Sequence, residues 1–385
     1  MSRGSKNLVT LFMALLATGA LAACGSDKSS SSTTSGSADA AAATTAATSA
    51  ADGKAAAAQA IAPYIGKPGK FPVVEALSKS PKGSKIAYMD CGTPVCALFW
   101  TLLEPAGKTM GVQVSRVKTG SSAATVDSAF SSVVAQKPDA VIVTAIDISL
   151  WQNHLKELQA AKIPVVTTGV TGVKEKGVDA PQAAESASSL EGKLLADYVA
   201  AEMKGKKIAL YKVPELPFTA IVASAFTDEL KKVCPDCSVR SVDVSVTTIG
   251  NTAPAKIVSD LQANPDTETA VFAIDEAQTG LPAALKTAGI NIETIGNSPG
   301  PTNLQYIRDG QETAALGVDL PVLIWTTLDI AARKIGGQGL KGDEAEGISP
   351  VQFLRKKDIV FDPSKGWTGY PDFGKRFGTL WAAGA

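Results

Sequence analysis

Short apolar runs alternate with longer amphipathic runs along most of this chain, and this alternation restricts the fold more than any other feature. In the first half, strands are predicted at 85–90, 112–117, 140–145 and 164–168, and helices at 97–110, 125–136 and 149–162. The strands are rich in β-branched residues and apolar on both sides, as in sheets that helices cover on both faces. The pattern therefore predicts the α/β class, with a doubly wound parallel sheet.

The second half repeats the order of the first. The Pro-Asp turn before the apolar strand 140–143 has a counterpart before the strand 270–274, and residues 160–169 resemble residues 287–296. More than 300 residues exceed what one hydrophobic core usually holds, so two similar lobes are predicted. Ligands of such sheets bind beyond the carboxyl ends of the strands, which predicts a binding cleft between the lobes.

The first residues follow the pattern of a secretory signal. Arg3 and Lys6 are positive, and the apolar run 8–16 is too short to span a bilayer. The sequence Leu21-Ala-Ala-Cys24 resembles the lipobox of bacterial lipoproteins, whose cysteine receives a lipid and becomes the first residue after cleavage. We therefore expect a signal peptide at 1–23 and an extracytoplasmic protein held at the cell membrane by a lipid on Cys24. The alternative is an ordinary signal peptide with a spare cysteine.

A tether is predicted behind this anchor, at 24–62. Residues 25–59 are almost all Ser, Thr, Ala and Gly, without Leu, Ile, Val or an aromatic residue. Such a segment cannot bury enough apolar surface to offset the entropy of ordering, so we expect it to be disordered. No later segment reaches the roughly 20 apolar residues that a membrane span needs.

Charge and motifs exclude several classes of function. Lys and Arg together number 37, as do Asp and Glu, and the absence of a basic run argues against a nucleic-acid partner. Gly107-Lys-Thr109 lacks the first glycine and the preceding strand of a P-loop, so no cofactor is predicted. The sole histidine, His154, is expected to be a surface or hydrogen-bonded side chain.

Four cysteines remain besides Cys24. They form two pairs that are close in the sequence, Cys91 with Cys96 and Cys234 with Cys237. In an exported protein an even number of cysteines indicates disulfides. A redox motif or half a zinc site is the alternative for Cys234 and Cys237, but zinc needs further ligands, and no metal site is predicted.

The chain resembles the type 1 periplasmic binding proteins, the ribose- and galactose-binding branch that serves ABC importers. The resemblance extends from about Lys85 to Ile359 and rests on the order of stretches such as 137–143, 161–166, 190–198, 270–276, 285–289 and 307–310. It implies two lobes joined by three hinge crossovers that close on a ligand. The implied boundaries are lobe 1 at 80–184 with 321–350, lobe 2 at 185–320 with 351–362, and a C-terminal tail at 363–385.

The resemblance also implies ligand-binding positions. In lobe 1 they are Thr93, Phe99, Asp147, Trp151, Gly169 and Val170; in lobe 2 and its crossover they are Ile249, Asp275, Glu276, Ser298 and Asp319. Gly169-Val170 replaces an Asp-Arg pair that often grips sugar hydroxyls, so several walls are more apolar than is usual in the family. A sugar, an apolar or aromatic molecule, or a cation paired with the acids all fit. For Phe99 and Trp151, packing in the core is an equal alternative. For Asp275, Glu276 and Asp319, the alternative is a solvated loop charge or a helix cap.

These features predict a monomeric, lipid-anchored, non-enzymatic solute receptor that delivers a small molecule to an ABC transporter permease. A sensory receptor of the same fold, signalling to a membrane kinase or chemoreceptor, is the second hypothesis. The third is a hydrolase using Ser298 within Gly296-Asn-Ser-Pro-Gly300. This nucleophile pattern needs a later histidine, and His154 precedes it.

Overall fold

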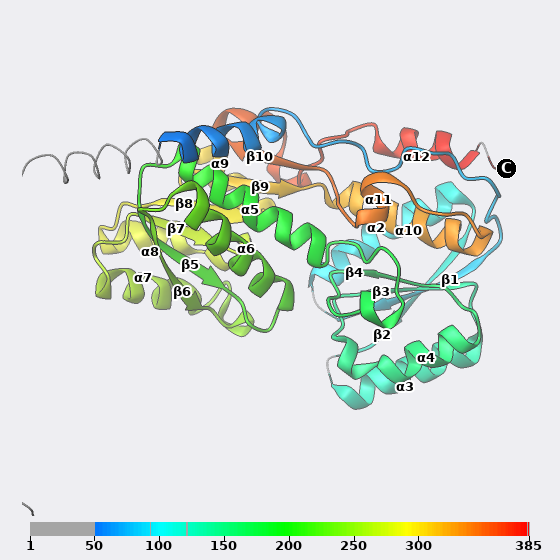
Figure 1. Ribbon diagram of the computed structural model, residues 1–385. Helices are drawn as coiled ribbons and strands as arrows, with labels where there is room; N and C mark the ends of the chain where they lie inside the picture. Colours follow the sequence, from blue (N-terminus) through cyan, green and yellow to red (C-terminus); the bar gives the residue numbers. More distant parts are fainter. Residues whose placement is uncertain (1–50, 93, 121, 383, 385) are drawn as a thin grey trace, which may run out of the picture. The chain divides into compact units, whose positions relative to one another are not determined.

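A computed structural model describes residues 51–92, 94–120, 122–382 and 384. The predicted signal peptide, Cys24 and Thr93 lie outside these residues. Within them, ten strands form two separate sheets, which Figure 1 shows with their flanking helices. None of the helices in this part of the chain combines the length and the apolar character that a bilayer crossing needs.

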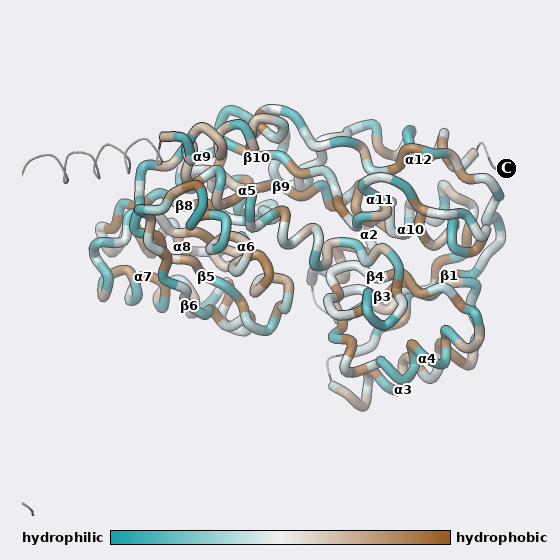
Figure 2. Tube along the Cα trace, viewed as in Figure 1, coloured by the Kyte–Doolittle hydropathy of each residue, from teal (hydrophilic) through white to brown (hydrophobic). Residues whose placement is uncertain are grey.

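The smaller sheet, in lobe 1, has four parallel strands in the order β2-β1-β3-β4. The strands are β1 (Lys85–Asp90), β2 (Gln113–Lys118), β3 (Ala140–Thr144) and β4 (Val165–Thr168), and the covering helices are α2 (Pro94–Met110), α3 (Ala123–Gln136), α4 (Gln152–Ala160) and α10 (Leu320–Gly336). Ile86 and Tyr88 pack with α2 and α10, whereas Ala87 and Met89 pack with α3 and α4. The alternation of side chains along a strand thus buries β1 on both faces. Figure 2 shows the matching hydropathy, with hydrophilic turns on α3 and α4.

The larger sheet, in lobe 2, has the order β10-β9-β8-β7-β5-β6, and only β10 is antiparallel to its neighbour. Its strands are β5 (Lys207–Lys212), β6 (Ser238–Asp243), β7 (Thr269–Phe272), β8 (Glu293–Asn297), β9 (Ala314–Val318) and β10 (Val351–Arg355). One face is covered by α5 (Glu185–Glu202) and α6 (Pro217–Val233), and the other by α7 (Ala253–Ala263), α8 (Leu281–Ala288) and α9 (Pro301–Asp309). Gly192 allows α5 and α6 to pack closely, because a Cβ there would lie 2.3 Å from the Val222 carbonyl oxygen.

The two sheets share one strand order. The order β2-β1-β3-β4 of lobe 1 returns as β6-β5-β7-β8 in lobe 2, which adds β9 and β10. After each Pro-Asp turn, a backbone N–H bonds to the start of the first strand: Asp139 to the Lys85 carbonyl and Glu268 to the Lys207 carbonyl, both at 2.8 Å. The prediction of two similar parallel α/β lobes is confirmed.

Three passages of the chain connect the two sheets. They lie at 169–184, at Asp319, and at 347–350 after the short helix α11 (Gly342–Glu346). The Ala183 N–H donates to the Gly347 carbonyl at 3.2 Å, and the Asp319 N–H donates to the Pro350 carbonyl at 2.9 Å. The passages are therefore hydrogen-bonded to one another rather than independent linkers.

The prediction of a disordered tether is wrong for its last part. Residues 51–61 are helical, and Ala57 and Ile61 are buried in the lobe 2 core beside α5 and α6. Gly53 approaches the Val233 carbonyl so closely that a Cβ would lie 2.4 Å from that oxygen. Alanine favours helix, and a few small contacts with α6 stabilise the segment. Residues 24–50 lie outside the described part of the chain.

The predicted C-terminal tail also packs. Its helix α12 (Phe373–Ala382) places Phe377 and Trp381 in the core of lobe 1. Trp381 stacks on Trp325 with ring centroids 5.2 Å apart, and its indole N–H donates to Asp329 Oδ1 at 2.6 Å. The carboxylate of Asp329 also binds the buried Arg333 at 2.5 Å. Aromatic burial and a satisfied indole donor thus fix this segment.

We expect Ile61→Ala to lower the free energy of unfolding by about 2–4 kcal/mol, because it removes a buried side chain and leaves a cavity. Urea denaturation of the full chain measures this. Gln59→Ala, at an exposed position of the same helix, is the matched control and should be nearly neutral. Equal effects of the two substitutions would show that the helix does not depend on its contact with lobe 2.

Candidate functional site

The carboxyl ends of the strands are the candidate site in each lobe, since that edge of a parallel sheet is free of crossover helices. In lobe 1 the residues that follow β1, β3 and β4 lie at this edge, and in lobe 2 those that follow β5, β7 and β8. The predicted ligand residues divide into those exposed here and those that the fold uses internally.

The loop after β1 is held by a disulfide. Cys91 and Cys96 are bonded, with Cα atoms 5.8 Å apart. The Tyr88 hydroxyl donates to the Cys96 carbonyl at 2.9 Å, and Asp90 Oδ1 accepts from the Gly92 N–H at 2.8 Å. The loop that begins the candidate site is thus fixed at both ends, although Thr93 itself is not among the described residues.

The second predicted disulfide, Cys234 to Cys237, is also formed, with Cα atoms 5.3 Å apart. It closes the turn between α6 and β6. Each disulfide has an aspartate close to its sulfur atoms, Asp90 in one case and Asp236 in the other. Sulfurs bonded to each other are not thiolate ligands, so these two groups are not metal sites.

Two positions in lobe 1 fit the ligand prediction. Asp147 follows β3 and is exposed; its Oδ1 accepts from the Ser149 N–H at 2.8 Å and caps the 3-10 turn η2 (Ile148–Leu150). Gly169 follows β4 in a left-handed conformation, with φ of 67°, and donates its N–H to the Gln182 carbonyl at 2.8 Å. The second carboxylate oxygen of Asp147 is therefore the clearest acceptor that this edge offers.

The structure contradicts three predicted ligand residues in lobe 1, since each is a core residue. Trp151 is 1% exposed, stacks on Phe130 at 5.1 Å and donates its indole N–H to the Ile146 carbonyl at 3.0 Å. Phe99 belongs to the cluster of α2 and α10, and Val170 to the cluster of α3 and α4. Helical spacing alone did not distinguish packing from ligand stacking.

In lobe 2, Ser298, Glu276 and Ile249 remain compatible with the prediction. Ser298 follows β8 with φ of 58°, is partly exposed and donates its N–H to the Leu316 carbonyl at 2.8 Å. Glu276 is exposed, and Ile249 is half-buried against the cluster that contains Ile257. These positions present a hydroxyl, a carboxylate and an apolar group.

Asp275 was predicted to bind ligand but belongs to a buried carboxyl pair. Asp275 is 0% exposed and Glu312 3% exposed. Gly296 makes room for the pair, because a Cβ there would overlap Asp275 Oδ1. Gln278 donates to Asp275 Oδ1, and Asn303 donates to the Asp275 carbonyl at 2.9 Å. Asp275 and these neighbours therefore lie inside lobe 2.

Burial raises the pKa of Asp275 to about 7, and burial beside Asp275 holds the pKa of Glu312 well above its usual range. Two adjacent buried carboxylates cannot both ionise cheaply, so burial favours the protonated form of at least one of them.

Asp319 was likewise predicted to bind ligand, and the structure uses it as a cap. It is 0% exposed; its Oδ1 accepts from the Val322 N–H at 3.2 Å, capping α10. Its Oδ2 accepts from the Thr368 hydroxyl at 3.0 Å and from the Gly369 N–H at 2.8 Å. Burial raises the pKa of Asp319 to about 6, and these donors limit the rise. Both of its carboxylate oxygens thus accept hydrogen bonds from within the protein.

Glu191 and Asn297 form a buried polar pair that the sequence analysis did not predict. Asn297 ends β8 beside Ser298 and donates to Glu191 Oε2 of α5 at 2.8 Å; both side chains are at least nine-tenths buried. Burial raises the pKa of Glu191. Asn297 could have been found as the polar residue preceding Ser298, but a single acid within a helical pattern gives no signal.

The hydrolase hypothesis lacks its base. His154 lies in lobe 1 on α4, where its ring nitrogens contact Asp127 Oδ1 at 2.9 Å and Glu157 Oε2 at 3.0 Å. Although burial opposes it, these hydrogen bonds raise the pKa of His154. Ser298 is in lobe 2, and no histidine is available to take its proton.

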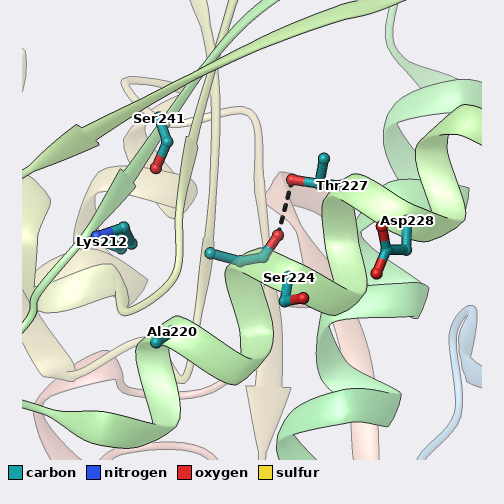
Figure 3. A pocket seen from close by; sticks show the side chains of 7 residues that line it. Lys212, Ala220, Ser224, Thr227, Asp228 and Ser241 are labelled. Carbon is teal, nitrogen blue, oxygen red and sulfur yellow. Dashed lines mark hydrogen bonds between the residues drawn. The ribbon is translucent and has the colours of Figure 1, made fainter.

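Two surface pockets lie in lobe 2. One, of about 280 Å³, lies between α6 and the strands β5 and β6 (Figure 3); it is lined by Lys212, Ala220, Ala223, Ser224, Thr227, Asp228 and Ser241. The other, of about 500 Å³, includes Lys204, Glu268 and Glu293 near the amino ends of the strands. Lys212 pairs with Asp243, and Thr227 bonds to the Ala223 carbonyl at 2.8 Å. Neither pocket contains a predicted ligand residue.

The buried pair predicts how stability depends on pH. Both carboxyls bind protons more tightly in the folded state, so the free energy of unfolding should fall as the pH rises from about 4 through 7. Glu312→Gln keeps a neutral partner for Asp275 and should make this decline shallower. Urea denaturation at about pH 5 and about pH 8 measures the difference, with Glu175→Gln, at an exposed position of lobe 1, as control. An unchanged pH slope in Glu312→Gln would contradict the assignment of this pH dependence to the buried pair.

Solved structures share this fold at low sequence identity. An ABC transporter solute-binding protein from Actinobacillus succinogenes has a TM-score of 0.61 and 17% identity, over 72% of this chain and 99% of its own. The binding protein of an arabinose ABC transporter from a Shewanella species has a TM-score of 0.63 and 18% identity, over 73% and 95%. An ABC transporter solute-binding protein from Agrobacterium vitis has a TM-score of 0.61 and 20% identity, over 73% of this chain and 98% of its own.

Sequence comparison identifies the family. No curated protein matches the sequence significantly. A sequence model of the periplasmic binding protein domain matches residues 80–339, which is more than half of the chain and covers both sheets up to β9. The chain therefore belongs to the periplasmic binding protein domain family and is a binding protein rather than an enzyme.

Proposed function

We propose that this chain captures a small, uncharged, sugar-like solute between the carboxyl edges of its two sheets and delivers it to an ABC import permease. The observation that carries the proposal is the paired site: two sheets of the same strand order, each with polar groups after its strands, in a chain of the periplasmic binding protein domain family. Asp147 and Gly169 supply the first edge, and Ser298 and Glu276 the second.

The use of the buried acids favours a neutral solute over a cation. Asp275 is buried beside Glu312, and burial raises its pKa; Asp319 accepts hydrogen bonds from Thr368 and Gly369. Two of the acids that could have paired with a cation are thus unavailable, whereas the exposed hydroxyl and carboxylate groups suit hydroxyl groups of a solute. Similar structures were solved with D-allose, α-D-tagatopyranose and allitol. Ile249 gives one apolar wall, so a partly apolar solute is the alternative.

The site is tested by titration calorimetry of the full chain with D-allose, D-tagatose, allitol and L-arabinose, guided by native mass spectrometry of freshly purified protein. We expect one solute per chain. Asp147→Ala should weaken binding about tenfold, as expected when a charged group loses a hydrogen bond.

Asp362→Ala is the matched control, because Asp362 is also exposed and caps a 3-10 turn, η7 (Pro363–Lys365), through the N–H two residues on. It should bind as the wild type does. Equal losses in the two variants, or no binding of any polyol, would contradict the proposed site.

We further propose that a lipid on Cys24 holds the chain at the outer face of the cell membrane. The charged start, the short apolar run and the small residues before Cys24 support this, as do disulfides suited to an oxidising compartment. A lipid would keep a monomeric receptor near its permease.

Cys24→Ser should move the protein from the membrane fraction to the soluble fraction and abolish metabolic labelling with a fatty-acid analogue. Ser26→Ala, at a neighbouring position, should leave both unchanged. Labelled, membrane-bound Cys24→Ser protein would refute the anchor.

A sensory role is the second candidate. A LacI-type transcriptional regulator from Bacteroides fragilis shares the fold with a TM-score of 0.58 at 11% identity, so this fold also occurs in a protein described as a regulator. Deleting a neighbouring permease gene separates the roles, because only an importer would then lose uptake of the solute.

A further inference from the structure

Besides the three passages described above, the chain crosses between the lobes in two further segments. Upstream, the helix at 51–61 packs in lobe 2 while Val73 and Leu77 pack in lobe 1. Downstream, Trp367 packs in lobe 2 while Phe373 and Phe377 pack in lobe 1. The segments 66–72 and 366–372 therefore bridge the lobes; together they are called the clasp.

The two segments of the clasp bind each other. The Tyr370 hydroxyl donates to the Gly69 carbonyl at 2.6 Å, and the Tyr370 ring meets Phe71 edge-on with centroids 5.2 Å apart. Pro68 lies so close to Gly369 that a Cβ on Gly369 would be 2.4 Å from the proline Cβ. The guanidinium of Arg376 lies 5.1 Å from the Tyr370 ring and 5.5 Å from the Phe71 ring. The contact thus combines a hydrogen bond, ring packing and a cation over two rings.

The clasp is also fixed to the connection between the sheets. Asp319 lies between β9 of lobe 2 and α10 of lobe 1, and its Oδ2 accepts from the Thr368 hydroxyl and the Gly369 N–H. The Gly69 N–H donates to the Val351 carbonyl at 2.9 Å, next to the third passage. A fully buried carboxylate is costly unless donors surround it, so its position depends on the clasp, and the clasp is held where the lobes would rotate.

We propose that the terminal segments 66–72 and 366–372 form a clasp that restricts the relative motion of the two lobes. The inference rests on the proposed function, in which the lobes move around a solute. Any rotation at Asp319 changes the distances to Thr368 and Gly369, and any rotation about the passages strains the Tyr370 contact with Gly69. The clasp therefore narrows the range of arrangements that the unliganded protein visits.

The test is the distance distribution between spin labels on unnatural amino acids at the exposed positions Lys156 in lobe 1 and Lys286 in lobe 2, in the full chain without solute. Thr368→Val with Tyr370→Phe removes two clasp hydroxyls and leaves the Asp319 cap of α10 intact. We expect the distribution to widen about twofold or more, since two hydrogen bonds that hold the segments are lost.

The matched control is Thr379→Val with Tyr306→Phe. Each of these hydroxyls forms a hydrogen bond within one lobe. The Thr379 hydroxyl donates to the Lys375 carbonyl at 3.0 Å, and the Tyr306 hydroxyl accepts from the Gly280 N–H at 3.1 Å. The control should keep the wild-type width. Equal widths in the clasp variant and the wild type would overturn the proposal, as would equal widening in both variants.

Hydrogen exchange of the wild type gives a second readout that needs no variant. The Gly69 and Gly369 amides donate to the Val351 carbonyl and to Asp319 Oδ2, and they should be protected as strongly as amides within the sheets. Rapid exchange at both would overturn the clasp. Because no solute is present, this outcome is independent of sugar binding. If no sugar bound but the distance distribution of the clasp variant were still wider than that of the wild type, the proposed function alone would be disproved.

Discussion

Burial of both faces of each parallel sheet is the constraint on which the rest of this structure depends. Helices cover β1 on both sides in lobe 1, and the strands of lobe 2 are covered in the same way. Polar side chains that meet solvent are therefore restricted to the edges of the sheets. The carboxyl edges carry Asp147, Gly169 and Ser298, and this is why the two lobes together can form a site although neither sheet face offers one.

The same burial decides the use of the acids. A carboxyl group that lies inside must find donors or keep its proton. Asp319 accepts from donors on α10 and on the C-terminal segment, Asp275 lies beside Glu312 with its pKa raised by burial, and Asp329 binds Arg333 and Trp381. Each of these acids ties together segments that are distant in sequence. These carboxyl groups interact with other parts of the protein rather than with a ligand, and the proposed solute is accordingly neutral.

The architecture was predictable because it follows from the periodic pattern of apolar residues in the sequence. Apolar strands, amphipathic helices and the repeated Pro-Asp turns predicted two similar lobes, and local cysteine pairs predicted both disulfides. The direction of single side chains was not predictable. Asp275 and Asp319 follow strands, as ligand residues do, yet their side chains turn inward. Ala57 and Ile61 order the end of a segment whose composition predicts disorder, because a few contacts with lobe 2 outweigh composition. The packing of Trp151 could not be predicted, because it depends on the position of Phe130, and no local sequence pattern gives that position.

A crystal structure of the chain with its bound solute tests the central claim most directly. The account predicts a solute that contacts residues from both carboxyl edges, including Asp147 of lobe 1 and Ser298 of lobe 2, with Asp275 and Asp319 keeping their internal partners. A solute held by one lobe alone, for example in the pocket between α6 and β6, would contradict it.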